Sequence, residues 1–188
     1  LYEEPVNDQE DLLGIVNPSL KRPFDVREVI SRIADGSRFE EFKPLFGPTI
    51  ICGFMKIHGH TVGVLGNNGS LFPDSSQKAA HFIQLCNQIS IPLVFLQNIT
   101  GFNIGKEFEQ NGSIKKGAQM LNAVSNSEVP HLTVILGNSY GAGTYAMSGR
   151  EFGNAFTFLW PTAKIAVMGG EQIAGVMSMV RRAKAMRD

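Results

Sequence analysis

Residues 132–143 read Leu132-Thr133-Val134-Ile135-Leu136-Gly137-Asn138-Ser139-Tyr140-Gly141-Ala142-Gly143 and join an apolar run to a glycine-rich loop. The run is mostly apolar and rich in β-branched side chains, which is typical of a strand buried on both faces of a parallel sheet. A short helix is expected after the loop, to about residue 148. The segment therefore predicts one strand–loop–helix unit of an α/β fold.

The same unit occurs earlier in the chain. Residues 91–96 form a continuous apolar run, residues 97–102 form a glycine-containing loop, and residues 113–124 have the pattern of a helix. In folds built from such units, ligands bind at the carboxyl ends of the strands. Both loops begin at such an end, so we expect them to share one site.

The remaining segments fit the same fold class. We expect a hairpin, three further helices and two short strands: strands at 49–57 and 61–65, helices from Asp25, from Pro73 and from Gly169, and strands at 156–160 and 164–168. Residues 1–24 are polar and aperiodic and are interpreted as a lead-in arm. Residues 25–188 are interpreted as one domain, and the chain as a fragment of a longer subunit.

Composition and charge exclude several classes of protein. Lys+Arg and Asp+Glu balance at 17 each, so charge gives no case for binding nucleic acid or an anionic membrane. No apolar run reaches the roughly 20 residues that a membrane span needs.

Cys52 and Cys86 lack metal-ligand spacing and are expected to be reduced thiols. His58 and His60 are expected to be turn residues, because no third ligand lies near them. We therefore expect no metal site.

The loop Gly141-Ala142-Gly143 is the first candidate site. Glycine lets a ligand approach the backbone closely, and the N–H groups at a helix start lack helical partners. Two such N–H groups aimed at one point form an oxyanion hole, which stabilises charge that develops on a carbonyl oxygen. The alternative is a tight turn with close helix packing.

The same loop contains a second pattern. Residues 137–141 match G-x-S-x-G, the nucleophile elbow of serine hydrolases, with Ser139 as the nucleophile. That mechanism needs an acid and then a His after the Ser. The last His is His131, and the only Asp that follows Ser139 is Asp188. The sequence therefore argues against a serine nucleophile.

The loop at 97–102 is the second candidate site. Gly101 permits an unusual backbone angle, and Phe102 can offer a flat apolar wall. The alternative is a structural turn with a buried phenylalanine. Composition and spacing leave both interpretations open.

Several stretches together resemble the carboxyltransferase β subunits of biotin-dependent acyl-CoA carboxylases, in their C-terminal domain. They occur in the family's order, cover roughly residues 14–175, and include Phe24-Asp25-Val26-Arg27-Glu28, Val64-Leu65-Gly66-Asn67-Asn68-Gly69, Phe95-Leu96-Gln97-Asn98-Ile99-Thr100-Gly101-Phe102, Ser139-Tyr140-Gly141-Ala142-Gly143-Thr144-Tyr145-Ala146-Met147 and Trp160-Pro161-Thr162-Ala163. One such motif is weak, whereas the ordered set is specific.

The resemblance implies a crotonase/ClpP-like fold, a spiral of ββα units. It also implies an active site shared with the N domain of another β subunit, which holds most of the CoA. The implied partners are a biotin carboxylase/biotin carrier α subunit and an acyl-CoA, within a hexameric core. The expected compartment is a bacterial cytoplasm or a mitochondrial matrix. This chain alone is expected to be inactive.

The resemblance also implies roles for single residues. Carboxybiotin, carried by the partner, is the carboxyl donor, and the N–H donors of the biotin oxyanion hole match Ala142 and Gly143. Gly101, Phe102 and Gly141 match residues that line the biotin pocket. No side-chain base is required.

The implied substrate is an acyl-CoA. Thr144 and Tyr145 resemble the methylcrotonoyl-CoA and geranyl-CoA branch, since propionyl-CoA and acetyl-CoA relatives tend to carry an acidic residue in place of Tyr145. We therefore expect 3-methylcrotonoyl-CoA as the acceptor. The alternative is a biotin-independent crotonase-fold enzyme that acts on CoA thioesters, such as a hydratase or decarboxylase.

Overall fold

A mixed seven-stranded sheet forms the centre of the protein. The structure is a computed structural model that describes residues 2–16, 24–99, 110 and 112–185. The strand order is β1-β2-β3-β4-β5-β6, and β7 also pairs with β5. The strands are β1 (Phe39–Glu41), β2 (Ile50–Ile57), β3 (His60–Asn67), β4 (Leu93–Ile99), β5 (His131–Tyr140), β6 (Phe156–Leu159) and β7 (Lys164–Ala166).

The direction of the strands changes at β3. β1, β2 and β3 pair antiparallel, whereas the β3–β4, β4–β5, β5–β6 and β5–β7 pairs are parallel. This arrangement confirms the hairpin predicted from strands at 49–57 and 61–65, and the predicted parallel unit from β4 to β5. Helices connect the parallel strands, as an α/β fold requires.

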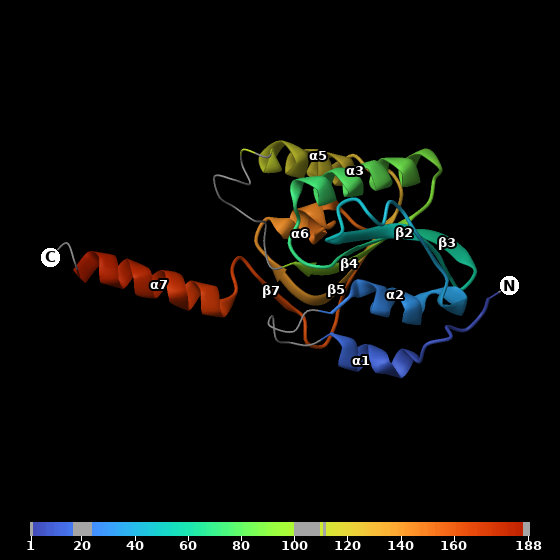
Figure 1. Cartoon of the computed structure of the whole chain (residues 1–188), viewed down its shortest axis with the longest axis horizontal. Helices are drawn as coiled ribbons and strands as arrows, with labels where there is room; N and C mark the ends of the chain where they lie inside the picture. The colour runs from blue at the N-terminus through green and yellow to red at the C-terminus, as the bar shows by residue number, and fades with distance from the viewer. Residues whose placement is uncertain (1, 17–23, 100–109, 111, 186–188) are drawn as a thin grey trace.

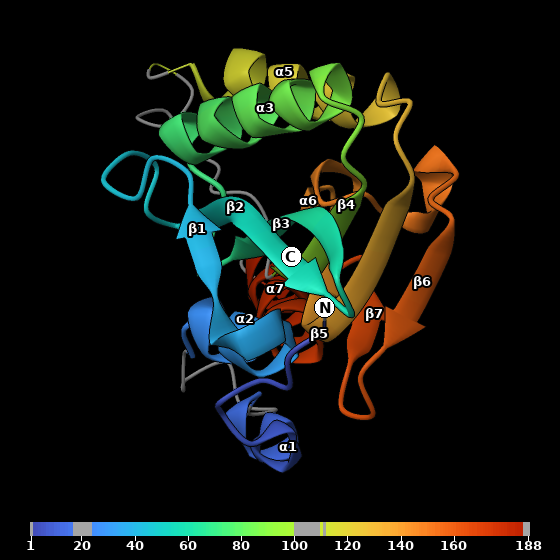
Figure 2. The ribbon, with the colours of Figure 1, turned by 90° about the vertical axis from the view of Figure 1, so that its right-hand side faces the viewer.

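Helices cover both faces of the sheet. α3 and α5 lie side by side over one face with α6 beneath them, and α1 and α2 lie on the opposite face (Figure 1; Figure 2). α7 extends away from the body of the molecule (Figure 1). The helices are α1 (Leu12–Ile15), α2 (Val26–Ile33), α3 (Pro73–Gln88), α5 (Ser113–Ser125), α6 (Gly143–Ala146) and α7 (Gly170–Ala185), with 3-10 turns η1 (Gln9–Asp11), η2 (Asp35–Ser37) and η3 (Arg150–Phe152).

The core has one apolar cluster on each side of the sheet. In β4, Leu93 and Phe95 enter the cluster under α3 and α5, whereas Val94 and Leu96 enter the cluster that α2 covers. All four side chains are buried, because successive residues of a strand point to opposite faces. The prediction of a strand buried on both faces is therefore confirmed. Cys52 and Cys86 are free thiols in the first of these clusters, as expected.

A buried carboxylate fixes the β2–β3 turn. Asp35 is 3% exposed and accepts hydrogen bonds from the N–H groups of His58 and Gly59, at 2.8 and 2.7 Å. His58 has a positive φ of 48°, which this turn requires. The prediction that His58 is a turn residue is confirmed, whereas the same prediction for His60 is wrong, because His60 is the first residue of β3.

Part of the expected lead-in arm lies against the domain. The Gly36 N–H donates to the carbonyl of Glu3, and the Val6 N–H donates to the Ser37 hydroxyl. Val16 is buried in the cluster under α2. Leu12, Ile15 and Val16 therefore pack into the core of the domain, and the predicted boundary at residue 24 stays a prediction.

Candidate functional site

The carboxyl ends of β4 and β5 lie next to each other, and the two predicted loops begin there. Ile99 pairs with Ser139, and β7 extends this edge by pairing Ala166 with Tyr140. The Gly141-Ala142-Gly143 loop follows β5 directly. Gly101 and Phe102 lie outside the described residues, so their predicted role stays a prediction.

The loop at 141–143 leaves two neighbouring backbone donors free. Gly141 has a φ of +66°, and its N–H donates to the Ala166 carbonyl at 3.2 Å. The Thr144 N–H donates to the Gly141 carbonyl at 3.3 Å. Within the part of the chain that the structure describes, the N–H groups of Ala142 and Gly143 have no acceptor. Two adjacent free amides are the donor set that an oxyanion hole needs.

The two residues after the loop differ in their surroundings. The Thr144 hydroxyl donates to the Gly141 carbonyl at 3.0 Å, so this side chain closes the turn. The Tyr145 side chain is 41% exposed, and its ring meets the ring of Phe152 edge-on at 6.2 Å. Tyr145 is thus available to a partner or ligand, whereas Thr144 is occupied by the loop itself.

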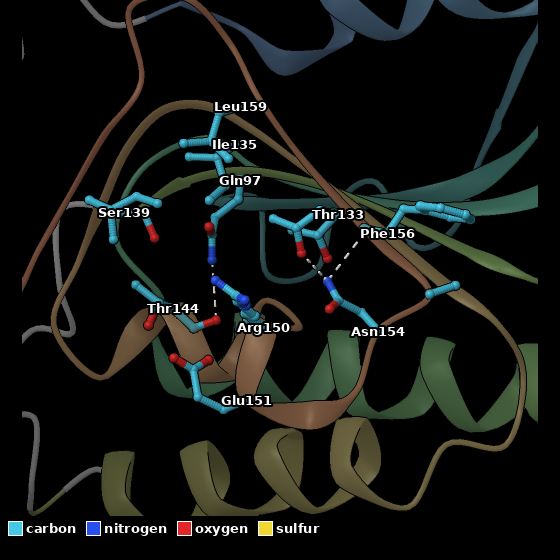
Figure 3. Close-up of a pocket in the computed structure, with 14 residues that line it drawn as sticks. Gln97, Thr133, Ile135, Ser139, Thr144, Arg150, Glu151, Asn154, Phe156 and Leu159 are labelled. Atoms are coloured by element: carbon cyan, nitrogen blue, oxygen red, sulfur yellow. Dashed lines mark hydrogen bonds between the residues drawn. The ribbon is translucent and has the colours of Figure 1, made fainter.

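A cavity of about 650 Å³ opens between β5, β6 and the segment formed by α6 and η3 (Figure 3). Figure 3 shows Gln97, Ser139 and Thr144 in one part of this cavity, and Thr133 with Asn154 in another. Its full lining comprises Gln97, Thr133, Ile135, Ser139, Thr144, Gly149, Arg150, Glu151, Asn154, Ala155, Phe156, Thr157, Leu159 and Ile165.

The geometry gives no support to a serine nucleophile at Ser139. Ser139 belongs to β5 and not to a strand-to-helix turn, and its side chain is 2% exposed. His131 lies at the other end of β5, with Nδ1 and Nε2 within 2.9 and 2.7 Å of the hydroxyls of Ser148 and Ser127. Burial lowers the pKa of His131 and favours the neutral imidazole. The argument against a nucleophile elbow is confirmed.

Sequence reasoning missed the side chains that hold the loop in place. The Gln97 amide donates to the Thr144 carbonyl at 3.1 Å, and the Asn98 amide oxygen accepts the Asn138 N–H at 2.9 Å. Both residues were assigned to a loop, but they belong to β4. One signal was available: Asn67, Asn98 and Asn138 each stand at or near the end of a strand.

Titratable clusters are sparse in this region. No group of three His, Cys, Asp or Glu side chains in the described residues could hold a metal ion. No helix within the described residues is long and apolar enough to cross a membrane.

The profile of the carboxyl transferase domain matches residues 2–188. The chain belongs to this carboxyl transferase family. It is 59% identical over 178 residues to a probable mitochondrial methylcrotonoyl-CoA carboxylase beta chain of Drosophila melanogaster, covering 95% of this chain and 31% of that protein. It is 54% identical over 180 residues to the corresponding protein of Dictyostelium discoideum, covering 96% and 31%.

Solved structures of the carboxyl transferase family agree with this fold. The beta subunit of geranyl-CoA carboxylase from P. aeruginosa has a TM-score of 0.93 at 49% identity, over 98% of this chain and 36% of that one. The transcarboxylase 12S core has a TM-score of 0.84 at 36% identity, over 94% and 36%. The predicted crotonase-like α/β fold is confirmed. The chain spans about a third of the length of these relatives.

Proposed function

We propose that this chain forms the biotin-binding half of a carboxyltransferase site, which transfers a carboxyl group from carboxybiotin to 3-methylcrotonoyl-CoA. The observation that carries the proposal is the pair of free N–H groups at Ala142 and Gly143, in a chain of the carboxyl transferase family. Carboxybiotin, held by a partner, would supply the carboxyl group at this loop. The backbone N–H groups of Ala142 and Gly143 would hold its ureido oxygen and would stabilise negative charge there.

The residues around the loop fit this group. Residues 137–145 contain no acidic side chain that would oppose the developing charge. Gly141 and Gly143 carry no side chain, which leaves room for a flat ring to approach the backbone. Gly101 and Phe102 are proposed to complete the wall of the biotin pocket. No side-chain base is assigned, because residues 137–145 carry no acidic or histidine side chain.

The choice of substrate is supported by the relatives. Three relatives named as methylcrotonoyl-CoA carboxylase beta chains are 59%, 54% and 52% identical to this chain. Two relatives named as propionyl-CoA carboxylase beta chains are 38% and 35% identical to it. Thr144 and Tyr145 are proposed as specificity residues. Tyr145 is 41% exposed beside the loop, which supports contact with an acyl group.

The remaining site is proposed to come from partners: the N domain of another subunit and a biotin-carrying α subunit. Exposed apolar side chains on β6, β7 and α7 support burial against other protein: Phe156, Phe158, Leu159, Ile165, Val176 and Met177. A hexameric core is proposed, as is named for the transcarboxylase 12S structure. The proposed compartment is a mitochondrial matrix or a bacterial cytoplasm, since relatives come from both groups.

The test uses the complete subunit, assembled with its biotinylated partner. ATP-dependent bicarbonate fixation is followed with methylcrotonoyl-, geranyl-, propionyl- and acetyl-CoA, and fixation is expected with methylcrotonoyl-CoA. Gly143→Pro removes one donor and should lower turnover about 10²- to 10³-fold. Ala142→Gly keeps its N–H and serves as the matched control, with turnover close to wild type.

Two results would overturn the proposal. Absence of fixation with all four substrates, from an assembled and biotinylated complex, would reject carboxyl transfer. Turnover of a CoA thioester without the biotinylated partner would favour the biotin-independent crotonase reading. Size-exclusion chromatography of each variant shows whether the assembly is intact.

A further inference from the structure

The pairing of β4 with β5 is irregular beside the proposed oxyanion loop. Gln97 pairs with Ile135, but Ile99 pairs with Ser139, so two steps along β4 correspond to four along β5. The extra β5 residues cannot all bond to the β4 backbone. A side chain takes over at this point: the Asn98 Oδ1 accepts the Asn138 N–H at 2.9 Å. The side-chain amide of Asn98 thereby replaces a backbone hydrogen bond that the irregular pairing leaves out.

A second side-chain amide holds Asn98 in turn. Backbone pairing of β3 with β4 ends at Gly66 and Leu96. Beyond it, the Asn67 Oδ1 accepts the Asn98 N–H at 2.8 Å, and the Asn67 Nδ2 donates to the Asn98 carbonyl at 2.5 Å. Asn67 is 2% exposed, so water does not compete for these bonds. The side-chain amides of Asn67 and Asn98 thus continue the hydrogen bonding of the sheet from β3 through β4 to β5.

Gln97 holds the other side of the loop. Its Nε2 donates to the Thr144 carbonyl at 3.1 Å (Figure 3). The side chain is 1% exposed, and its Oε1 has no partner within the described residues. Keeping a buried amide with an unpaired oxygen lowers the stability of the fold. A buried residue that lowers stability in this way is expected where it serves a function.

We propose that Gln97 and Asn98, braced by Asn67, are positioning residues for carboxyl transfer. Gln97 hydrogen-bonds to the Thr144 carbonyl, and Asn98 hydrogen-bonds to the Asn138 N–H. These two adjacent β4 residues therefore anchor both ends of segment 138–144. The free N–H groups of Ala142 and Gly143 lie between these anchors. An oxyanion hole works only when its donors are held in place beforehand, and an error of about 1 Å costs about 10²-fold in rate. The inference rests on the proposed function.

The test compares amide variants in the complete, biotinylated assembly. Asn98→Leu and Gln97→Met keep roughly the original size but remove the anchoring bonds. We expect kcat to fall about 10- to 100-fold while KM for the acyl-CoA changes less than threefold. Asn98→Asp keeps an acceptor for the Asn138 N–H and should recover most of the lost kcat.

Asn87 provides a matched structural control. It makes a comparable set of bonds, to the Ile83 carbonyl, the Ser127 hydroxyl and the Glu128 N–H, but it anchors the segment before β5, far along the chain from the loop. Asn87→Leu should lower the thermal midpoint as much as Asn98→Leu does. Its kcat, measured well below that midpoint, should stay at the wild-type value.

Hydrogen exchange provides a readout that does not depend on activity. In Asn98→Leu and Gln97→Met, amides of residues 139–147 should exchange faster, and in Asn87→Leu they should not. Wild-type exchange rates and wild-type kcat in the two β4 variants would overturn the positioning role. If the wild type fixes no carboxyl group, the proposed function fails, whereas the exchange comparison still decides whether these amides hold the loop.

Discussion

Gly137 lies directly against the side chain of Asn98: a Cβ at position 137 would stand 2.6 Å from the Asn98 Oδ1. Contacts this short between a Cβ and an oxygen do not occur, so any side chain at 137 must displace the Asn98 amide. The same oxygen accepts the Asn138 N–H. A glycine at 137 is therefore needed for the Asn138 N–H to bond to the Asn98 amide where the backbone pairing of β4 and β5 is irregular.

Gly137→Ala should consequently act like a variant of Asn98. We expect the Asn98 amide to swing away, the Asn138 N–H to lose its acceptor, and kcat in the assembled enzyme to fall about 10-fold or more. Loss of the bond should also cost about 1–2 kcal/mol of stability. Steady-state fixation and thermal unfolding measure the two effects. Gly14→Ala is the control, since nothing lies within 4 Å of a Cβ there; a Gly137→Ala enzyme with normal kcat would contradict the expectation.

Burial of His131 predicts a loss of stability in mild acid. His131 is 5% exposed, and burial lowers its pKa in the folded state. As pH falls below about 6.5, the unfolded chain takes up a proton that the folded chain resists, so the free energy of unfolding falls until the folded pKa is passed. Urea unfolding between pH 7.5 and 5 measures this slope. His131→Gln should flatten it.

The control for that slope is His60→Gln, because His60 is an exposed residue at the start of β3. This variant should keep the wild-type dependence on pH. An acid slope that survives His131→Gln would assign the loss of stability to other groups. Such a result would show that protonation of His131 does not cause the loss of stability in acid.

Lys78 allows a test of how the core tolerates a buried amine. Its side chain is 1% exposed, and its Nζ donates to the Ile50 carbonyl at 2.9 Å. Burial lowers the pKa of Lys78, because the low-dielectric surroundings disfavour the ammonium form. Lys78→Met keeps the volume and removes the charge, so it should cost less than about 1.5 kcal/mol. Lys78→Ala should cost about 2–4 kcal/mol, because it leaves a cavity.

Urea unfolding of both Lys78 variants at pH 7.5 measures the difference. Equal losses in Lys78→Met and Lys78→Ala would show that the bond to Ile50, and not side-chain volume, is what the core requires. Lys56→Met is a suitable control, since Lys56 lies on the neighbouring strand β2 with an exposed side chain. It should change stability by less than about 0.5 kcal/mol.

Local pattern was sufficient to predict the elements. The apolar runs at 91–96 and 132–136 predicted strands buried on both faces, and the structure contains them within β4 and β5, with β4 beginning at Leu93. The helices at Pro73–Gln88 and Ser113–Ser125 also begin and end close to the predicted residues. Such predictions succeed because the period of apolar residues depends on neighbours within one element.

The candidate loop was predictable for the same reason, and its supports were not. Glycines at 141 and 143 after a buried strand predict, from the sequence itself, that a ligand can approach the backbone there. Gln97 and Asn98, in contrast, looked like the start of a loop, because amides are common in turns. Their function depends on residues 47 and 40 positions away, at Thr144 and Asn138.

The sequence by itself determined the fold class, the position of the glycine loop after β5 and the family resemblance, since each depends on residue order within short segments. The tertiary structure decided which groups meet. It placed Ser139 inside β5 and His131 at the opposite end of that strand, and it shifted the register of β5 against β4. That shift is a property of two paired strands, not of either one, and it alone sets the Asn98 amide against the Asn138 N–H.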